Sequence, residues 1–175
     1  IGAGCLGTTQ DITIINSSIT VTGGSWGAGI GSGTEGTTGD ITISGGTVTA
    51  TGGHGAAGIG SGYGTKSSVC GNITITSGTI TAKSNGEGAG IGTGSASNTQ
   101  CGTITITGGW IKTDGGTSKS YPGPGIGNGA VNTKALTIKI SGGTITTTGA
   151  SGSYGIKAQT SVQITGGSVK AMDSS

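Results

Sequence analysis

The chain has 175 residues, of which 43 are glycine and none is phenylalanine; only 8% are charged, and the formal net charge is +2. Glycine at this frequency disfavours helices, because it loses more conformational freedom on folding than any other residue. Two prolines and no three-residue glycine period exclude collagen, and the many Ile, Val and Thr residues argue against disorder. No apolar run approaches the ~18 residues of a membrane span. Eight lysines without arginine are too dilute for a nucleic-acid footprint, so neither membrane insertion nor a nucleic-acid partner is expected.

Six similar units follow one another along the chain, and each begins at an Ile next to a Gly. These landmarks are Ile1, Ile30, Ile59, Ile91, Ile126 and Ile156. A second segment lies at 12–14, 41–43, 73–75, 104–106, 138–140 and 162–164, and a third at 19–21, 48–50, 80–82, 111–113, 145–147 and 169–171. Self-similarity at a nearly fixed period of this length is typical of repeat architectures.

The second and third segments alternate apolar and polar residues, which is typical of strands with one buried side. In the second unit Ile41, Ile43 and Val48 would point to one side and the threonines between them to the other. Three short strands per unit cannot bury their apolar sides alone, whereas stacked units bury them together. We therefore expect an all-β fold, a right-handed parallel β-helix with three strands per coil and about six coils. Residues 1–175 would form a single β-solenoid segment, expected to be part of a longer protein.

The glycines suggest two roles. Gly-Gly pairs such as Gly45-Gly46 lie between the second and third strands, where a sharp corner favours positive φ. Glycines of the first strand alternate with core-facing residues, so they would face outward as a plane without side chains, which is a candidate assembly face. The alternative is that this stretch is a tight arc rather than a strand. The residues of the candidate face are Gly29, Gly31, Gly58, Gly60, Gly90, Gly92, Gly125 and Gly127.

Cys70 and Cys101 occupy equivalent positions in consecutive units. Stacking places equivalent residues about 4.8 Å apart, within disulfide range, so we expect these two cysteines to be joined; two stacked thiols are the alternative. Cys5 has no equivalent partner in this chain. A disulfide together with scarce charge indicates an extracellular setting.

Asp11 and Asp40 are the two acids at equivalent positions in adjacent units. They would either hold a cation between them or, as we expect, accept hydrogen bonds from corner amides at the start of a strand. His54 has no cysteine or acid at ligand spacing and is expected to be a solvated loop residue. No metal or other cofactor is predicted.

Two stretches carry a family resemblance: Gly-Ala-Gly-Ile-Gly-Ser-Gly (27–33) and Asp-Ile-Thr-Ile-Ser-Gly-Gly-Thr-Val-Thr-Ala-Thr-Gly-Gly (40–53). This pattern resembles the Gly/Thr-rich repeats of large secreted or wall-attached proteins of Clostridia-type bacteria, which are often labelled adhesin-like or carbohydrate-binding. The resemblance covers nearly the whole chain and implies a β-helix on a bacterial surface or in the secreted fraction. It supplies no functional residue.

All aromatic residues fall at corners or at outward strand positions, namely Trp26, Trp110, Tyr63, Tyr121 and Tyr154. Sugars stack on exposed aromatic rings, so we expect a non-catalytic module for adhesion or carbohydrate binding whose partner is a polysaccharide or glycan surface. The alternative for these rings is that they cover glycine corners.

Two other functions fit the same fold. The first is a structural spacer or a self-assembling fibre unit, whose partners would be further copies of itself. The second is ice binding along outward threonine ladders, although Trp110 and Lys112 interrupt the ladder of the third strand. An enzyme is not expected, because only Asp11 and Asp40 pair among six acids and no arginine is present to hold an anionic sugar.

Overall fold

The alternating Ile/Thr segments form strands, and each strand pairs in parallel with the same segment of the neighbouring repeat. The structure, a computed structural model, describes residues 1–132 and 134–174. Within these ranges every pairing between strands is parallel and no helix occurs. Ile41 stands beside Ile12 on one side and beside Ile73 on the other. The expected all-β parallel β-helix is therefore confirmed.

A nine-stranded sheet contains the second and third segments of all six repeats. Its strands are β2 (Ile12–Thr22), β5 (Ile41–Gly52), β8 (Ile73–Ser84), β11 (Ile104–Ile106), β12 (Trp110–Asp114), β14 (Thr137–Ile140), β15 (Thr144–Gly149), β17 (Ser161–Ile164) and β18 (Ser168–Asp173). In the first three repeats one long strand covers both segments, because the corner is only a bulge: Gly45 (φ 96°) and Gly46 (φ 82°) bend β5 while its pairing continues. In the last three repeats the same corner separates two strands.

Two further sheets form the remaining sides of the coils. The Ile-Gly landmarks pair as β3 (Ile30–Gly31), β6 (Ile59–Gly60), β9 (Ile91–Gly92), β13 (Ile126–Gly127) and β16 (Ile156–Lys157). A four-stranded sheet, additional to the three strands per coil that the sequence predicts, contains β1 (Thr8–Thr9), β4 (Thr37–Thr38), β7 (Ser68–Cys70) and β10 (Thr99–Gln100). The first four coils thus pair along one more side than expected.

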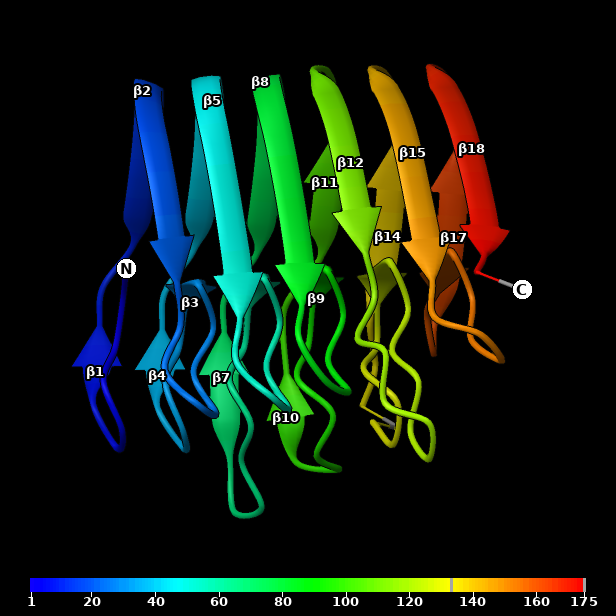
Figure 1. Cartoon of the computed structure of the whole chain (residues 1–175). Coiled ribbons are helices and arrows are strands. Elements are labelled where there is room, and N and C mark those ends of the chain that lie inside the picture. The colour runs from blue at the N-terminus through cyan, green and yellow to red at the C-terminus, as the bar shows by residue number, and fades with distance from the viewer. Residues whose placement is uncertain (133, 175) are drawn as a thin grey trace.

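The chain winds into a β-solenoid of about five turns, because the sixth repeat ends before its coil is complete. Figure 1 shows the hand of the winding. Strands at the back of the view, such as β11 and β17, run upward, and the front strands β12 and β18 run downward. The coils meanwhile progress from the N-terminus on the left to the C-terminus on the right, so the winding is right-handed, as is usual for parallel strand connections.

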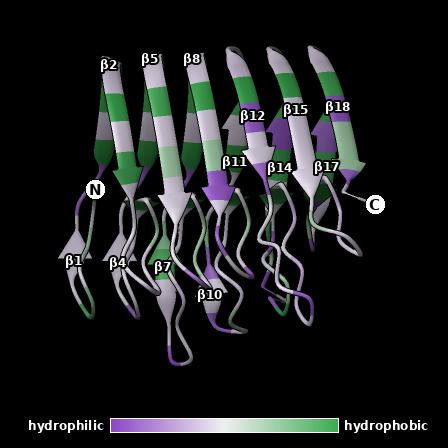
Figure 2. Cartoon of the chain, in the orientation of Figure 1, coloured by the Kyte–Doolittle hydropathy of each residue, from purple (hydrophilic) through white to green (hydrophobic). Residues whose placement is uncertain are grey.

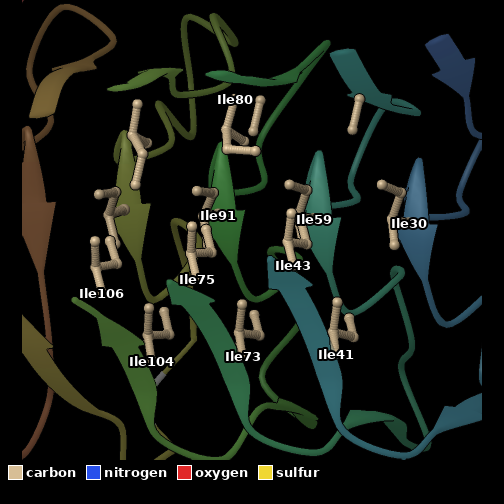
Figure 3. Close-up of a cluster of buried hydrophobic side chains, with 14 of the residues drawn as sticks. Ile30, Ile41, Ile43, Ile59, Ile73, Ile75, Ile80, Ile91, Ile104 and Ile106 are labelled. Carbon is tan, nitrogen blue, oxygen red and sulfur yellow. The ribbon is translucent and has the colours of Figure 1, made fainter. Parts of the chain in front are cut away.

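The core is a set of isoleucine columns parallel to the axis. Figure 3 shows one column that consists of Ile41, Ile73 and Ile104, and these three side chains are fully buried. Full burial of one such side chain stabilises the fold by roughly 1.5–3 kcal/mol. In the last coil Val162 and Ile164 remain 43% and 50% exposed, since no described coil packs over them.

The expectation of an exposed glycine plane is wrong. Every member is buried: Gly29, Gly31, Gly58, Gly60, Gly90, Gly92, Gly125 and Gly127. A Cβ at Gly29 would lie 2.8 Å from the carbonyl oxygen of Thr51, and a Cβ at Gly31 (φ 133°) would overlap the carbonyl oxygen of Gly60. These glycines therefore permit close approach between backbones inside the stack, where the Ile-Gly segments form two-residue strands.

Candidate functional site

Three rings from three different loops meet at the N-terminal end of the solenoid. Trp26 follows β2, His54 follows β5 and Tyr63 follows β6. The Trp26 ring lies 5.0 Å from the His54 ring in an edge-to-face arrangement and 4.8 Å from the Tyr63 ring, measured between centroids. Both separations lie in the range in which aromatic rings attract one another. We call these three residues the aromatic cluster.

Backbone hydrogen bonds fix the loops that carry the aromatic cluster. The amide of His54 donates to the carbonyl of Ser25 (2.6 Å), and the amide of Tyr63 donates to the carbonyl of Trp26 (2.9 Å). Gly55 leaves room for the rings, because a Cβ there would lie 2.6 Å from Cδ2 of Tyr63. The cluster is therefore held by the scaffold rather than by the side chains alone.

The aromatic cluster is accessible to solvent. Trp26 is 41% exposed, His54 is exposed and Tyr63 is half-buried. A pocket of about 390 Å³ adjoins Trp26, and its walls are formed by residues 1–5 and 22–28 together with Gly33 and Thr34. A flat ring beside a concave, partly polar wall is the usual composition of a small-ligand site.

Trp110 stands apart from the cluster, on the outward side of β12. It is 47% exposed, and its neighbours in the adjacent coils are Thr79 and Thr144. Because the flanking threonines are small, about half of the Trp110 side chain remains accessible to solvent. This register also establishes that the outward threonine column is interrupted at the fourth coil.

Tyr121 and Tyr154 lie in the loops after β12 and β15 and are 50% and 64% exposed. Among the described residues, ring–ring contacts occur only within the aromatic cluster. None of the five Trp and Tyr residues belongs to the core, as the sequence predicts, but only Trp26 and Tyr63 are brought together.

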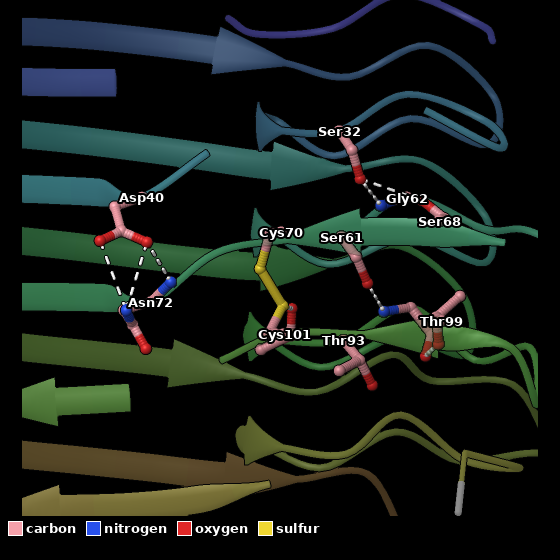
Figure 4. Close-up of a disulfide and its surroundings, with 12 residues drawn as sticks. Ser32, Asp40, Ser61, Gly62, Ser68, Cys70, Asn72, Thr93, Thr99 and Cys101 are labelled. Carbon is pink, nitrogen blue, oxygen red and sulfur yellow. Dashed lines mark hydrogen bonds between the residues drawn. A yellow bond between two sulfur atoms is a disulfide. The ribbon is translucent and has the colours of Figure 1, made fainter. Parts of the chain in front are cut away.

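The disulfide between Cys70 and Cys101 is present and joins the third and fourth coils (Figure 4). The Cα atoms are 4.6 Å apart, and both residues are buried in the core beside the isoleucine columns. Cys5 is exposed and has a free thiol. The disulfide therefore belongs to the scaffold rather than to an accessible redox site.

The carboxylates of Asp11 and Asp40 serve a hydrogen-bond ladder. Oδ1 of Asp11 accepts from the amide of Asp40 (2.8 Å), and Oδ1 of Asp40 accepts from the amide of Asn72 (2.7 Å). Asn72 continues the series by accepting from the amide of Thr103 (2.9 Å). This agrees with the interpretation of the two acids as acceptors for corner amides. Within the described ranges, no group of three or more His, Cys, Asp or Glu side chains is placed to hold a metal ion.

A second ladder, inside the coil, was missed at the sequence level. The residue after each central Ile-Gly pair is buried, and its side-chain oxygen accepts from an amide of the following coil. Ser32 accepts from Gly62 (3.1 Å), Ser61 from Gly94 (3.0 Å), Thr93 from Gly129 (2.9 Å) and Asn128 from Gln159 (3.1 Å). Figure 4 shows Ser32 and Ser61 in these positions. The recurrence of a small polar residue after Ile-Gly is the signal that could have revealed it.

Lys157 takes the place that glycine holds in the other Ile-Gly strands. Its Nζ donates to the carbonyl of Ala130 (3.0 Å), and partial burial lowers the pKa of its amino group because desolvation disfavours the charged form. No acid is paired with it in the part of the chain that the structure describes. Lys157 therefore acts as a tether at the last coil.

A family model described as a β-helix repeat matches residues 41–63 and 73–95, which include most of the second and third coils. The match and the architecture agree that the chain is a β-helix repeat protein. No curated protein and no solved structure matches the chain. The described residues form no helix of a kind that could cross a membrane.

Proposed function

We propose that this chain is a non-catalytic module of a secreted or cell-surface bacterial protein, and that it binds glycans or mediates adhesion. The observation that carries the proposal is the aromatic cluster, in which three loops of a rigid solenoid hold Trp26 against His54 and Tyr63 and leave Trp26 41% exposed. Loops on a rigid scaffold are where binding residues concentrate.

The chemistry of the cluster suits a sugar ring. The C–H surface of a sugar stacks on an aromatic face, while its hydroxyls bond to nearby backbone amides and carbonyls. The pocket beside Trp26 has backbone-rich walls, with Gly2, Gly4, Gly24 and Gly27 among its residues. Because the loops are already hydrogen-bonded, little ordering accompanies binding, and this favours affinity.

The proposed location draws on two further features. The buried disulfide between Cys70 and Cys101 is the kind of bond that persists in oxidising compartments. The Gly/Thr-rich repeat resembles those of secreted or wall-attached bacterial proteins. Both support a place outside the cell.

The test is a binding screen against neutral polysaccharides and a glycan array with the wild-type chain and Trp26→Ala. We expect at least one neutral glycan to bind and Trp26→Ala to weaken it by at least tenfold, about 1.4 kcal/mol. Tyr154→Ala is the matched control, because Tyr154 is also an exposed loop aromatic but has no ring partner; it should bind normally. Absence of any glycan binding, or equal binding by Trp26→Ala, would contradict the proposal.

A rigid spacer is the second candidate. The observation that favours it is the continuity of the coils, which are linked by two hydrogen-bond ladders and one covalent bond. A spacer would bind none of the glycans and would keep its length under load. Force spectroscopy of the oxidised chain between two handles would measure that resistance, and electron microscopy would show whether copies associate into filaments.

A further inference from the structure

The outward residues on the front strands of the nine-stranded sheet in Figure 1 change along the axis from uncharged residues to a mixture that includes charged ones. We define the front face as the outward residues of six strand segments: 18–22 of β2, 47–51 of β5, 79–83 of β8, and β12, β15 and β18. The first two segments present only Ser and Thr. From β8 onward lysines and a tryptophan appear, and Figure 2 shows hydrophilic colour on β8, β12 and β18 but not on β2 or β5. The substituted positions are Lys83, Trp110, Lys112, Asp114, Lys170 and Met172.

These side chains form one patch. Lys112 is two residues after Trp110 on the same side of β12, which places their Cα atoms about 6.6 Å apart. Thr146 lies between Lys112 and Lys170, because β15 pairs with both β12 and β18, so the two lysines are about 9.6 Å apart along the axis. Lys83 is one coil from Lys112 in the opposite direction.

The patch is positively charged because little within the chain neutralises it. The side chains of Lys83, Lys112 and Lys170 are exposed, and within residues 1–132 and 134–174 none of their ammonium groups forms a hydrogen bond or an ion pair. Asp114 is the one acid among the described residues of the front face, and it stands opposite Lys83. Asp173, at the end of β18, is on the other side of that strand from Lys170.

Other acids of the chain are engaged by its own groups, away from this patch. Asp11 and Asp40 accept backbone amides in the ladder described above. Glu35 accepts from the hydroxyl of Thr65 (3.1 Å), and Glu87 accepts from the hydroxyl of Ser95 (2.6 Å). Apart from Asp114, these acids therefore lie away from the front face and do not neutralise its lysines.

We infer that the front face over β8, β12, β15 and β18 binds an extended polyanionic polysaccharide, such as a polymer of uronic acids. A sugar ring stacks on Trp110 while carboxylates of neighbouring sugars pair with Lys112 and Lys170. The surrounding threonines supply hydroxyls, and the polymer continues past a groove of about 200 Å³ in which Lys83 faces the paired Asp114, beside Thr117 and Thr148. This inference rests on the proposed glycan-binding function and names a second surface and its ligand class.

Charge complementarity selects this partner over a neutral one. Exposed lysines attract anions over about 8–10 Å at physiological ionic strength, and the attraction weakens as salt is added. Trp110 adds a contact that depends on the ring rather than on charge. The combination predicts binding that is both salt-dependent and ring-dependent.

The experiment measures binding of the full chain to polygalacturonate, to a neutral glucan and to a single-stranded oligonucleotide of similar charge. Variants are Trp110→Thr, which continues the threonine column, and Lys112→Gln. Lys66→Gln is the matched control, since Lys66 is exposed in the loop between β6 and β7, away from the front face. We expect polygalacturonate binding to fall at least tenfold in both front-face variants, to weaken with salt, and to be unchanged in Lys66→Gln.

Three results would overturn the inference: no preference for polygalacturonate over the glucan, an equal loss in Lys66→Gln, or oligonucleotide binding with the same dependence on Trp110. Trp26→Ala separates this inference from the proposed function. Neutral-glycan binding that Trp26→Ala abolishes, without polygalacturonate binding, would leave the proposed function intact and reject the front face. Thermal unfolding of each variant verifies that it is folded.

Discussion

The first three coils and the last three share one interior but present different exteriors. Ile73 in the third coil and Ile138 in the fifth occupy the same buried column, yet the outward residue after them is Thr74 in one and Lys139 in the other. On the front face, Thr79 gives way to Trp110 without any shift of register. The difference teaches that the winding depends on inward columns and close backbone approach, which leaves outward positions free to diverge.

The largest expected effect tests whether the interior is equivalent in both halves. Gly60→Ala and Gly127→Ala should each lower the free energy of unfolding by more than about 4 kcal/mol, because a Cβ would overlap a carbonyl oxygen of the following coil and φ is positive at both sites. Gly24→Ala, where a Cβ meets nothing within 4 Å, should change it by less than about 1 kcal/mol. Urea unfolding followed by circular dichroism measures all three. If only one of the two alanine variants lowered the free energy of unfolding, the interiors of the two halves would not be equivalent.

The disulfide crosses the boundary between the two halves. Reducing it should lower the free energy of unfolding by roughly 3–4 kcal/mol, because the bond closes a loop across a separation of 31 residues that would otherwise gain entropy on unfolding. The measurement compares oxidised and reduced protein in a Cys5→Ser background, which removes the exposed thiol that could exchange. Equal stability in the two states would contradict a structural role.

A smaller effect is specific to the first half. Oγ1 of Thr38 is buried without a hydrogen-bond partner, beside Cys70 in the next coil. Thr38→Val should therefore raise the free energy of unfolding by about 1 kcal/mol, because it removes an unsatisfied polar group while keeping the shape. Thr37→Val, at the exposed neighbouring position, is the control and should change stability by less than about 0.5 kcal/mol. Destabilisation by Thr38→Val would show that the hydroxyl is used.

The smallest expected effect concerns Trp110, an outward position that should tolerate substitution, unlike the buried glycines. Trp110→Thr should leave the free energy of unfolding within about 0.5 kcal/mol of wild type, because threonine already occupies the same column in the third and fifth coils. Thermal unfolding checks this. A large loss would mean that the ring supports the sheet and that the exterior is not free to diverge.

Most of the fold was predictable because its signal is local and repeated. Alternation of Ile with Thr predicts strands, and the alignment of the units alone places Cys70 beside Cys101. The glycine plane was wrongly predicted because alternation carries no information where residues lack a side chain; which side Gly29 faces depends on the backbone of Thr51, a distant segment.

The sequence predicted which residue types form the candidate site, but not which of these residues lie together in the structure. Counting aromatics puts them outside the core, yet the sequence assigns Trp26 and Tyr63 to different corners of the coil. Their contact requires two loops from different turns to lie side by side, a non-local arrangement that includes the hydrogen bond from the Tyr63 amide to the carbonyl of Trp26. The ladder through Ser32 and Ser61 escaped notice because serine after glycine is typical of any turn.

Both ladders have a direction. Ser61 accepts an amide from the following coil, as Asp40 does, and each of the ladder bonds named above runs the same way. In solenoids, folding propagates from a formed unit to its neighbours. When it propagates from an N-terminal coil of this protein, each added coil therefore meets side-chain acceptors that are already ordered on the coil before it.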